Sequence, residues 1–192
     1  MTTPILGTRP DAPAPRVTTI LAISGSPSPT SKTARVLRHV ADSLPGLTTC
    51  DVRILKVRDL SPEVLLGADP NHPEILAVLE AIRAADGVII ATPVYKAAYS
   101  GVLKALLDLL PQFALEGKVV LPLATGGTIA HVLAIDYALR PVLNSMGATH
   151  VVPGFFILDK LITEHEDGIV IEEPAQTLLD GVVRAFVTAL RT

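Results

Sequence analysis

The chain has 192 residues, of which 49% are hydrophobic and 18% are charged, enough apolar material for one globular domain. Its formal net charge of -3 argues against a nucleic-acid partner, because nucleic-acid binding normally requires a basic surface. No apolar run approaches the roughly 18 residues of a membrane-spanning helix, and no basic region with a hydrophobic core indicates a secretory signal. The single cysteine, Cys50, excludes an internal disulfide framework. We therefore expect a cytoplasmic protein with no membrane partner.

The order of predicted elements indicates the fold. Residues 1–16 are rich in proline and lack hydrophobic periodicity, so we expect a disordered or loosely packed tail before one domain at 17–192. The sequence then predicts five strands, at 17–23, 50–57, 88–91, 119–124 and 150–152. It predicts helices at about 31–44, 73–85, 101–110, 130–146 and 174–190. This alternation predicts a flavodoxin-like three-layer sandwich, with a five-stranded parallel sheet of order 2-1-3-4-5.

The loop after the first predicted strand, at residues 24–33, reads S-G-S-P-S-P-T-S-K-T and is rich in hydroxyl groups. It ends at a helix N-terminus, where free backbone N–H groups and the helix dipole favour an anion. The hydroxyls of Ser26, Ser31 and Thr33 can donate to a phosphate monoester, and Lys32 can offset its charge. The loop is neither a Walker A motif nor a G-x-G-x-x-G turn. The simpler alternative is that Ser31 or Thr33 only caps the helix.

The loop after the third predicted strand reads A-T-P-V-Y-K-A-A-Y-S-G, at residues 91–101, and its residue types are not those a core needs. Ligands of open α/β sheets bind at the carboxyl ends of strands. We predict that Pro93, Val94 and Tyr95 lie against a flavin ring, with backbone amides near Tyr95 and Lys96 at the polar edge of that ring. The alternative is ordinary packing for the tyrosine and a solvated charge for the lysine.

The loop after the fourth predicted strand begins Thr125-Gly126-Gly127. Two adjacent glycines allow the backbone to lie close against a planar ligand, although a flexible turn is the simpler interpretation of such a pair. The carboxyl ends of the first, third and fourth predicted strands meet at one edge of the sheet. The three loops together therefore predict one pocket with a phosphate end and a ring end.

Three segments of the chain resemble the NAD(P)H-dependent FMN reductases: residues 91–101, 107–110, and 117–139 (G-K-V-V-L-P-L-A-T-G-G-T-I-A-H-V-L-A-I-D-Y-A-L). The nearest type is the reductase of the two-component alkanesulfonate-assimilation system. The similarity runs from about residue 18 to 154. It implies FMN-binding roles for Ser26, Ser31, Lys32 and Thr33 at the phosphate and for Pro93, Val94, Tyr95, Lys96, Ser100, Thr125, Gly126 and Gly127 around the ring. One departure is Ser28, where the family usually carries arginine.

The fourth predicted helix contains Pro141, whose missing N–H leaves the carbonyl of Tyr137 without a partner. A π-bulge would relieve this conflict, and such bulges are frequent at functional sites. The resemblance implies an extra tyrosine of this helix at a subunit interface beside the flavin, which we assign to Tyr137; the alternative is a packed tyrosine with no effect on turnover. The helix at 101–110 is apolar on more than one face. With the fourth helix it is the expected oligomer surface of a homodimer or homotetramer.

The resemblance implies that the chain binds FMN, oxidises NADPH or NADH, and supplies reduced flavin to a monooxygenase, for the assimilation of alkanesulfonate or related sulfur sources. Because the cofactor carries the chemistry, we expect no catalytic side chain and no metal, and we expect His131 to be structural. Two other functions stay open. One is a flavoprotein with tightly bound FMN that reduces quinones, azo compounds or metal ions. The other, a flavodoxin-like electron carrier, is disfavoured because such carriers are strongly acidic.

Overall fold

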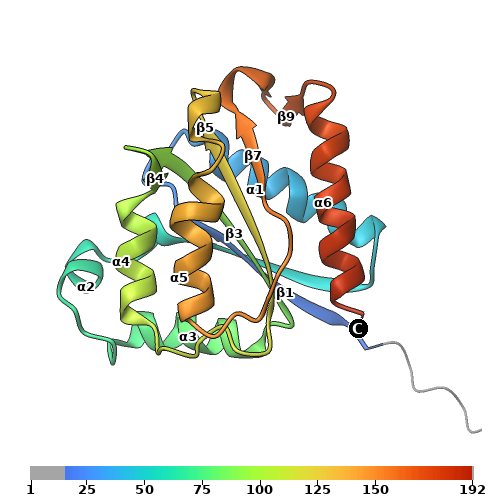
Figure 1. Cartoon of the computed structure of the whole chain (residues 1–192). Helices are drawn as coiled ribbons and strands as arrows, with labels where there is room; N and C mark the ends of the chain where they lie inside the picture. Colours follow the sequence, from blue (N-terminus) through green and yellow to red (C-terminus); the bar gives the residue numbers. More distant parts are fainter. Residues whose placement is uncertain (1–15, 192) are drawn as a thin grey trace, which may run out of the picture.

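The computed structural model describes residues 16–191, so nearly all of the expected N-terminal tail lies outside the described residues. A central sheet lies between two layers of helices (Figure 1). One face packs on a layer made of α3 (Pro73–Ala84), α4 (Gly101–Leu109) and α5 (Arg140–Ser145). The other face packs on α1 (Lys32–Ser43) and α6 (Ala175–Ala189). The three-layer sandwich predicted from the sequence is confirmed.

The sheet has the predicted strand order. From one edge it runs β2 (Cys50–Lys56), β1 (Thr18–Ser24), β3 (Gly87–Tyr95) and β5 (Val119–Gly126), all parallel. The fifth place is shared by β6 (His150–Val151) and β7 (Phe155–Leu158), which pair with different parts of β5. Pro153 lies between them and cannot donate to the ladder, so the fifth strand is interrupted. The single strand expected at 150–152 is therefore too short.

Besides β7, one short α-helix and three short strands were not predicted. The helix α2 (Pro62–Leu66) lies in the segment expected to be a loop, and β8 (Ile162–His165) pairs with β9 (Gly168–Ile171) as a separate hairpin. The strand β4 (Ala98–Tyr99) folds back antiparallel on the end of β3. The turn between β3 and β4 consists of Lys96 and Ala97, with φ angles of 51° and 64°. Such turns normally carry Asn or Gly, so the usual sequence signal is missing.

The segment expected to be one helix at 130–146 is divided. A 3-10 turn (Ile129–His131) is followed by a π-helical turn (Ile135–Leu139) that leads directly into α5. Within the π turn the N–H of Arg140 bonds to the carbonyl of Ile135, five residues earlier. The π-bulge predicted ahead of Pro141 is confirmed, whereas the prediction of a continuous helix is wrong.

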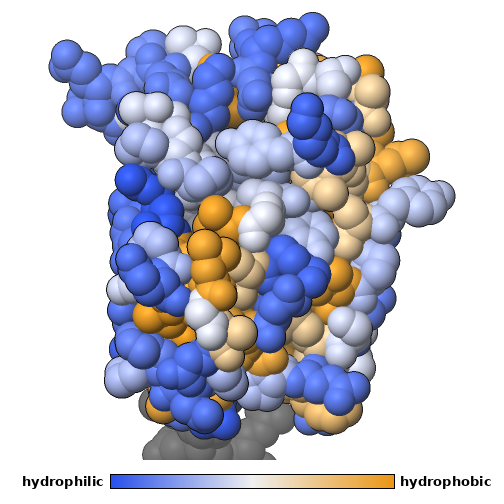
Figure 2. Space-filling view, turned by 90° about the vertical axis from the view of Figure 1, so that its left-hand side faces the viewer, coloured by the Kyte–Doolittle hydropathy of each residue, from blue (hydrophilic) through white to orange (hydrophobic). Residues whose placement is uncertain are grey.

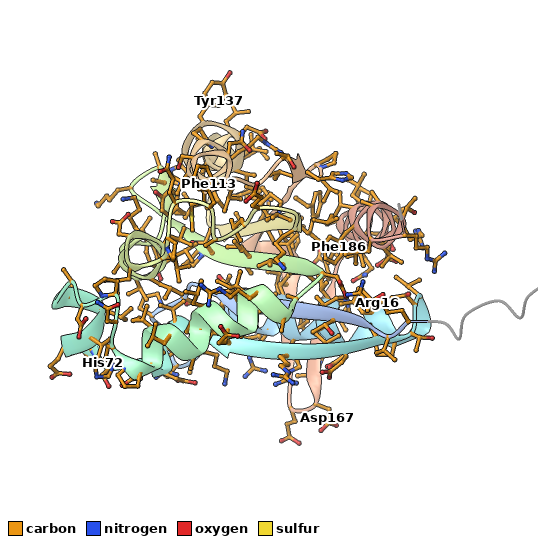
Figure 3. All side chains as sticks on the ribbon, turned by 90° about the horizontal axis from the view of Figure 1, so that it is seen from below. Arg16, His72, Phe113, Tyr137, Asp167 and Phe186 are labelled. Carbon is orange, nitrogen blue, oxygen red and sulfur yellow. The ribbon has the colours of Figure 1, made fainter. Side chains whose placement is uncertain are left out.

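The hydrophobic core has a cluster on each face of the sheet. Its largest fully buried side chain is Phe186 of α6, which lies over the sheet (Figure 3). Gly87 begins β3 at this contact, and a Cβ there would approach the Phe186 ring to 2.6 Å. The close approach of α6 to β3 therefore requires glycine at this position. Among the described residues, none of the helices is long and apolar enough to cross a membrane.

Gly154→Ala is expected to lower the stability of the fold. A Cβ at this position would lie 2.7 Å from the backbone oxygen of Pro122 and 2.8 Å from the side chain of Ile135. The backbone atom belongs to β5 and cannot move without disturbing the sheet. We expect the free energy of unfolding, measured by urea denaturation, to fall by about 1–3 kcal/mol.

Gly181→Ala is the matched control, because a Cβ there would meet no atom within 4 Å. Gly181 lies inside α6, so alanine should leave stability unchanged or raise it by about 0.5–1 kcal/mol. An equal loss in both variants would contradict the close approach of β5 to the segment between β6 and β7.

Candidate functional site

A pocket of about 210 Å³ lies where β1, β3, β5 and β7 reach their carboxyl ends. Ligands bind at this edge in open α/β sheets. Four segments line the pocket, with the residues Ser26, Ser28, Thr30, Ser31, Lys32, Thr33, Pro93, Val94, Tyr95, Thr125, Gly126, Gly127 and Asp159. The three predicted loops therefore meet in one pocket, which contains every predicted site residue except Lys96, Ser100 and Tyr137.

Hydroxyl groups gather at the N-terminus of α1. Ser31 caps the helix, since its Oγ accepts a hydrogen bond of 3.0 Å from the N–H of Ala34. Ser26 Oγ accepts a weaker bond of 3.3 Å from the N–H of Ser28. Both serines are buried, and in these bonds both hydroxyls act as acceptors. Each hydroxyl proton thus stays available to an anion in the pocket, so capping by Ser31 and anion binding are compatible.

Thr33 and Thr125 link α1 to β5. Their hydroxyl oxygens lie 2.6 Å apart, and both side chains are buried. Because one hydroxyl must donate to the other, only one proton of the pair remains for a ligand. The pair lines the pocket, and it also fixes the distance between the loop after β1 and the loop after β5.

Lys32 crosses the pocket from α1 to the end of β7. Its Nζ donates a hydrogen bond of 2.7 Å to the backbone carbonyl of Asp159. The ammonium group is thereby held at the pocket wall, near the hydroxyls of the first loop. Lysine binds phosphate as a point charge, so this position suits the predicted role.

Asp159 is a pocket residue that the sequence interpretation missed. Its half-buried carboxyl lies beside Gly127, where an added Cβ would be 4.0 Å from Oδ2. Burial raises the pKa of this carboxyl above its ordinary value, and the charge of Lys32 acts in the opposite direction. The available signal was the apolar run Phe155–Leu158 followed by an acidic residue, which is the pattern of a strand that ends at the ligand edge.

Ser100 does not line the pocket, but its hydrogen bonds join the segments that form the pocket walls. Its Oγ donates a short hydrogen bond to the carbonyl of Gly25 and accepts one of 3.1 Å from the N–H of Leu103. Its N–H donates to Thr92 Oγ1 at 3.0 Å. The N–H of Gly25 in turn bonds to the carbonyl of Ala91 at 2.8 Å. Ser100 therefore caps α4 and joins the loop at residues 91–101 to the loop after β1.

The remaining predicted residues lie on the outer side of the second loop and beyond it. Lys96 is exposed in the turn between β3 and β4, and the side chain of Tyr95 is 48% exposed at the pocket mouth. Tyr137 is 79% exposed and points away from the sheet (Figure 3). Strand β4 packs against the π turn that carries Tyr137. Tyr137 is thus separated from the pocket by the β3–β4 hairpin within one chain.

The donor set fits a phosphate monoester joined to a flat ring. Hydroxyls, one ammonium group and the first N–H groups of α1 lie at one end, where an anion is favoured. Pro93, Val94 and Tyr95 supply an apolar wall, and Gly126 and Gly127 leave the facing wall without side chains. FMN has both of these parts, so the residues present fit it.

Comparison with known proteins leads to the same ligand. The family model described as NADPH-dependent FMN reductase matches residues 18–162. An FMN reductase (NADPH) from Escherichia coli (strain K12) is 44% identical over 171 residues, 89% of each chain. The NADH-dependent FMN reductase SfnF of Pseudomonas putida is 32% identical over 161 residues, 82% of this chain and 84% of that one. The apo crystal structure of an NADH:FMN oxidoreductase (EMOB) has a TM-score of 0.82 at 43% identity, and the match covers 90% of each chain.

Ser100→Ala is expected to destabilise the protein by about 1–3 kcal/mol, because it removes a helix cap and the buried partner of the Gly25 carbonyl. The free energy of unfolding can be measured by urea denaturation. Ser145→Ala is the control, since Ser145 Oγ donates to the Val142 carbonyl at 2.7 Å in an exposed position. That variant should change stability by less than about 0.5 kcal/mol. Equal effects would contradict the linking role of Ser100.

Proposed function

Because the chain belongs to the NADPH-dependent FMN reductase family, we propose that it reduces FMN and releases the reduced flavin to a partner monooxygenase. A member of this family is an oxidoreductase that works with FMN and a reduced nicotinamide nucleotide. The partner, and a role in alkanesulfonate or related sulfur assimilation, are proposed from the resemblance of residues 91–101 and 117–139. We propose either NADPH or NADH as the reductant, since similar proteins are named for each coenzyme.

The proposal rests on one observation: a single pocket has an anion-binding end and an apolar end. At the anion end, Ser26 and Ser31 would donate hydroxyl protons to the FMN phosphate, and Lys32 would supply a positive charge. The N-terminus of α1 carries no acidic residue in its first turn, so nothing there competes with the phosphate for the helix dipole.

At the ring end, the chain binds and orients rather than reacts. Pro93, Val94 and Tyr95 would support one side of the isoalloxazine, and the glycine pair would admit its other parts. Bound FMN supplies the hydride-accepting centre. Among the residues that line the pocket, only Lys32, Tyr95 and Asp159 have titratable side chains. We expect none of the three to act as a general base, because the hydride transfer takes place at bound FMN.

We propose that FMN exchanges between protein and solvent rather than remaining bound. Lys32 is the only cation among the residues that line the pocket, and Ser28 stands where the family usually has arginine. Tyr95 is about half exposed, so the ring end opens to solvent. The alternative, tightly bound FMN that serves quinones, azo compounds or metal ions, would give a yellow protein after purification and ping-pong kinetics.

We also propose that the chain forms a homodimer or homotetramer. Ile129, Leu133 and Tyr137 expose apolar side chains along one segment. A second apolar area gathers in the middle of the face formed by α2 and α4 (Figure 2), where Leu65, Leu66 and Val102 line a groove. Exposed apolar surface of this kind is typical of protein interfaces. The first area lies next to the β3–β4 hairpin that borders the pocket, so a second copy there would approach the flavin.

Oxidation of NADPH under anaerobic conditions should depend on added FMN, and Lys32→Met should raise the FMN Kd about 10- to 100-fold, as for a lost charged hydrogen bond. Flavin absorbance during an NADPH titration measures reduction, and fluorescence quenching measures the Kd. Ser26→Ala should have a smaller effect, about 3- to 10-fold, because its hydroxyl is neutral.

Lys160→Met is the control for Lys32→Met, since Lys160 is an exposed lysine close to Asp159 that does not line the pocket. It should change the FMN Kd by no more than about twofold, as expected for a screened surface charge. NADPH oxidation without any flavin would contradict the proposed function, and an unchanged Kd in Lys32→Met would remove that residue from the phosphate site.

Tyr137→Ala should weaken self-association or flavin retention, because it removes a large ring that is 79% exposed in the single chain. Sedimentation velocity over a range of protein concentrations measures the first, and FMN dissociation rates measure the second. Leu178→Ala is the control, since Leu178 is an exposed apolar residue on α6. Wild-type behaviour of Tyr137→Ala in both measurements would leave Tyr137 without a role in assembly or exchange.

A further inference from the structure

We propose that Asp159 is a specificity-determining residue of the flavin pocket: its carboxylate weakens the binding of phosphorylated flavin and so keeps FMN exchangeable. The inference rests on the proposed function and names a residue that acts on the phosphate of FMN. Asp159 differs from the other polar residues that line the pocket. Every other polar side chain in the lining can donate a hydrogen bond, whereas an ionised carboxylate can only accept one.

The sheet places this carboxylate at the ligand edge. Strand β7 runs parallel to β5, and their register pairs Gly126 with Leu158. The next residues along the two strands are Gly127 and Asp159, which both line the pocket. Gly127 has no side chain, and the carboxylate lies close to it, since a Cβ at Gly127 would be 4.0 Å from Oδ2 of Asp159.

The carboxylate has no partner of its own among the described residues, none of which donates a hydrogen bond to it or forms an ion pair with it. The hydrogen bond of 2.7 Å from Lys32 goes to the backbone carbonyl of Asp159, not to its side chain. Burial raises the pKa of this carboxyl, and the charge of Lys32 lowers it by a smaller amount. An anion in the pocket would therefore meet a negative charge that Lys32 offsets only in part.

The hydrogen bond between Lys32 and the Asp159 carbonyl also limits the distance between a bound phosphate and the Asp159 carboxylate. A phosphate that binds Lys32 Nζ lies about 2.8 Å from it, the usual length of a charged hydrogen bond. The nitrogen is itself held against the main chain of Asp159. Phosphate and carboxylate therefore lie well within the Debye length of about 10 Å at 0.1 M salt, and they repel each other. Lys32 attracts the phosphate, while Asp159 limits the affinity that results.

Riboflavin is the comparison ligand, because it has the ring and ribityl chain of FMN but no phosphate. A change in the FMN Kd that the riboflavin Kd does not share is therefore an effect on the phosphate. At pH 8 the phosphate of FMN is a dianion, since the second pKa of a phosphate monoester is about 6. We expect Asp159→Asn to lower the FMN Kd about 3- to 10-fold, measured by flavin fluorescence quenching, and to leave the riboflavin Kd within about twofold. The gain for FMN should shrink as salt is added.

Two variants keep the test specific. Asp159→Glu keeps the charge and should keep the weaker binding of FMN. Asp167→Asn makes the same change of charge at the β8–β9 turn, where Asp167 points away from the body of the protein (Figure 3). Asp167 does not line the flavin pocket, so this variant should leave both Kd values unchanged.

The outcomes that overturn the inference are distinct. Weaker binding of both flavins by Asp159→Asn would show that the carboxylate accepts a hydrogen bond from the ribityl chain instead. An unchanged ratio of the two Kd values would show that Asp159 does not act on the phosphate. If the wild-type protein bound neither flavin, the proposed function itself would fail. A normal FMN Kd with an unchanged ratio would overturn only the role of Asp159.

Discussion

The parallel register of β1, β3, β5 and β7 is the constraint on which the site depends. It brings four chain segments to one edge of the sheet, although they are far apart in the sequence. Hydrogen bonds then join those segments in pairs, through Thr33 with Thr125, Ser100 with Gly25, and Lys32 with Asp159. Each bond crosses between loops that leave different strands. These bonds between the loops hold the pocket walls together.

The charged groups of the pocket act on an anion in opposite directions. One ammonium group and a helix N-terminus attract an anion, and one carboxylate opposes it. A protein that retains its cofactor gains from every added donor, whereas a protein that delivers the cofactor elsewhere must also let it go. In the proposed exchange of FMN, Ser28 and Asp159 would act in the same direction, Ser28 by lacking a positive charge and Asp159 by adding a negative one. We therefore propose that these two residues keep the affinity of the phosphate end for FMN moderate.

The fold and three of the four pocket segments were predictable because their signals are local. Apolar strands and amphipathic helices alternate along the chain, and loops rich in Ser, Pro or Gly come after strands. The fourth segment was missed because Pro153 and Gly154 interrupt the last strand, so the run Phe155–Leu158 was not recognised as its continuation. The turn at Lys96 and Ala97 was missed because lysine and alanine rarely adopt the positive φ angles that it requires.

The π turn before Pro141 has a geometric consequence for the outer surface. A regular helix advances about 100° per residue, so one additional residue in a turn rotates the segment before the turn by about that angle relative to the helix after it. Here α5 stays fixed on the sheet through Leu143, while the segment that bears Ile129 and Leu133 comes before the turn. A single-residue insertion can in this way reorient the exposed residues before the turn while α5 keeps its place on the sheet. The exposed residues Ile129, Leu133 and Tyr137 are therefore not among those that hold the sheet together.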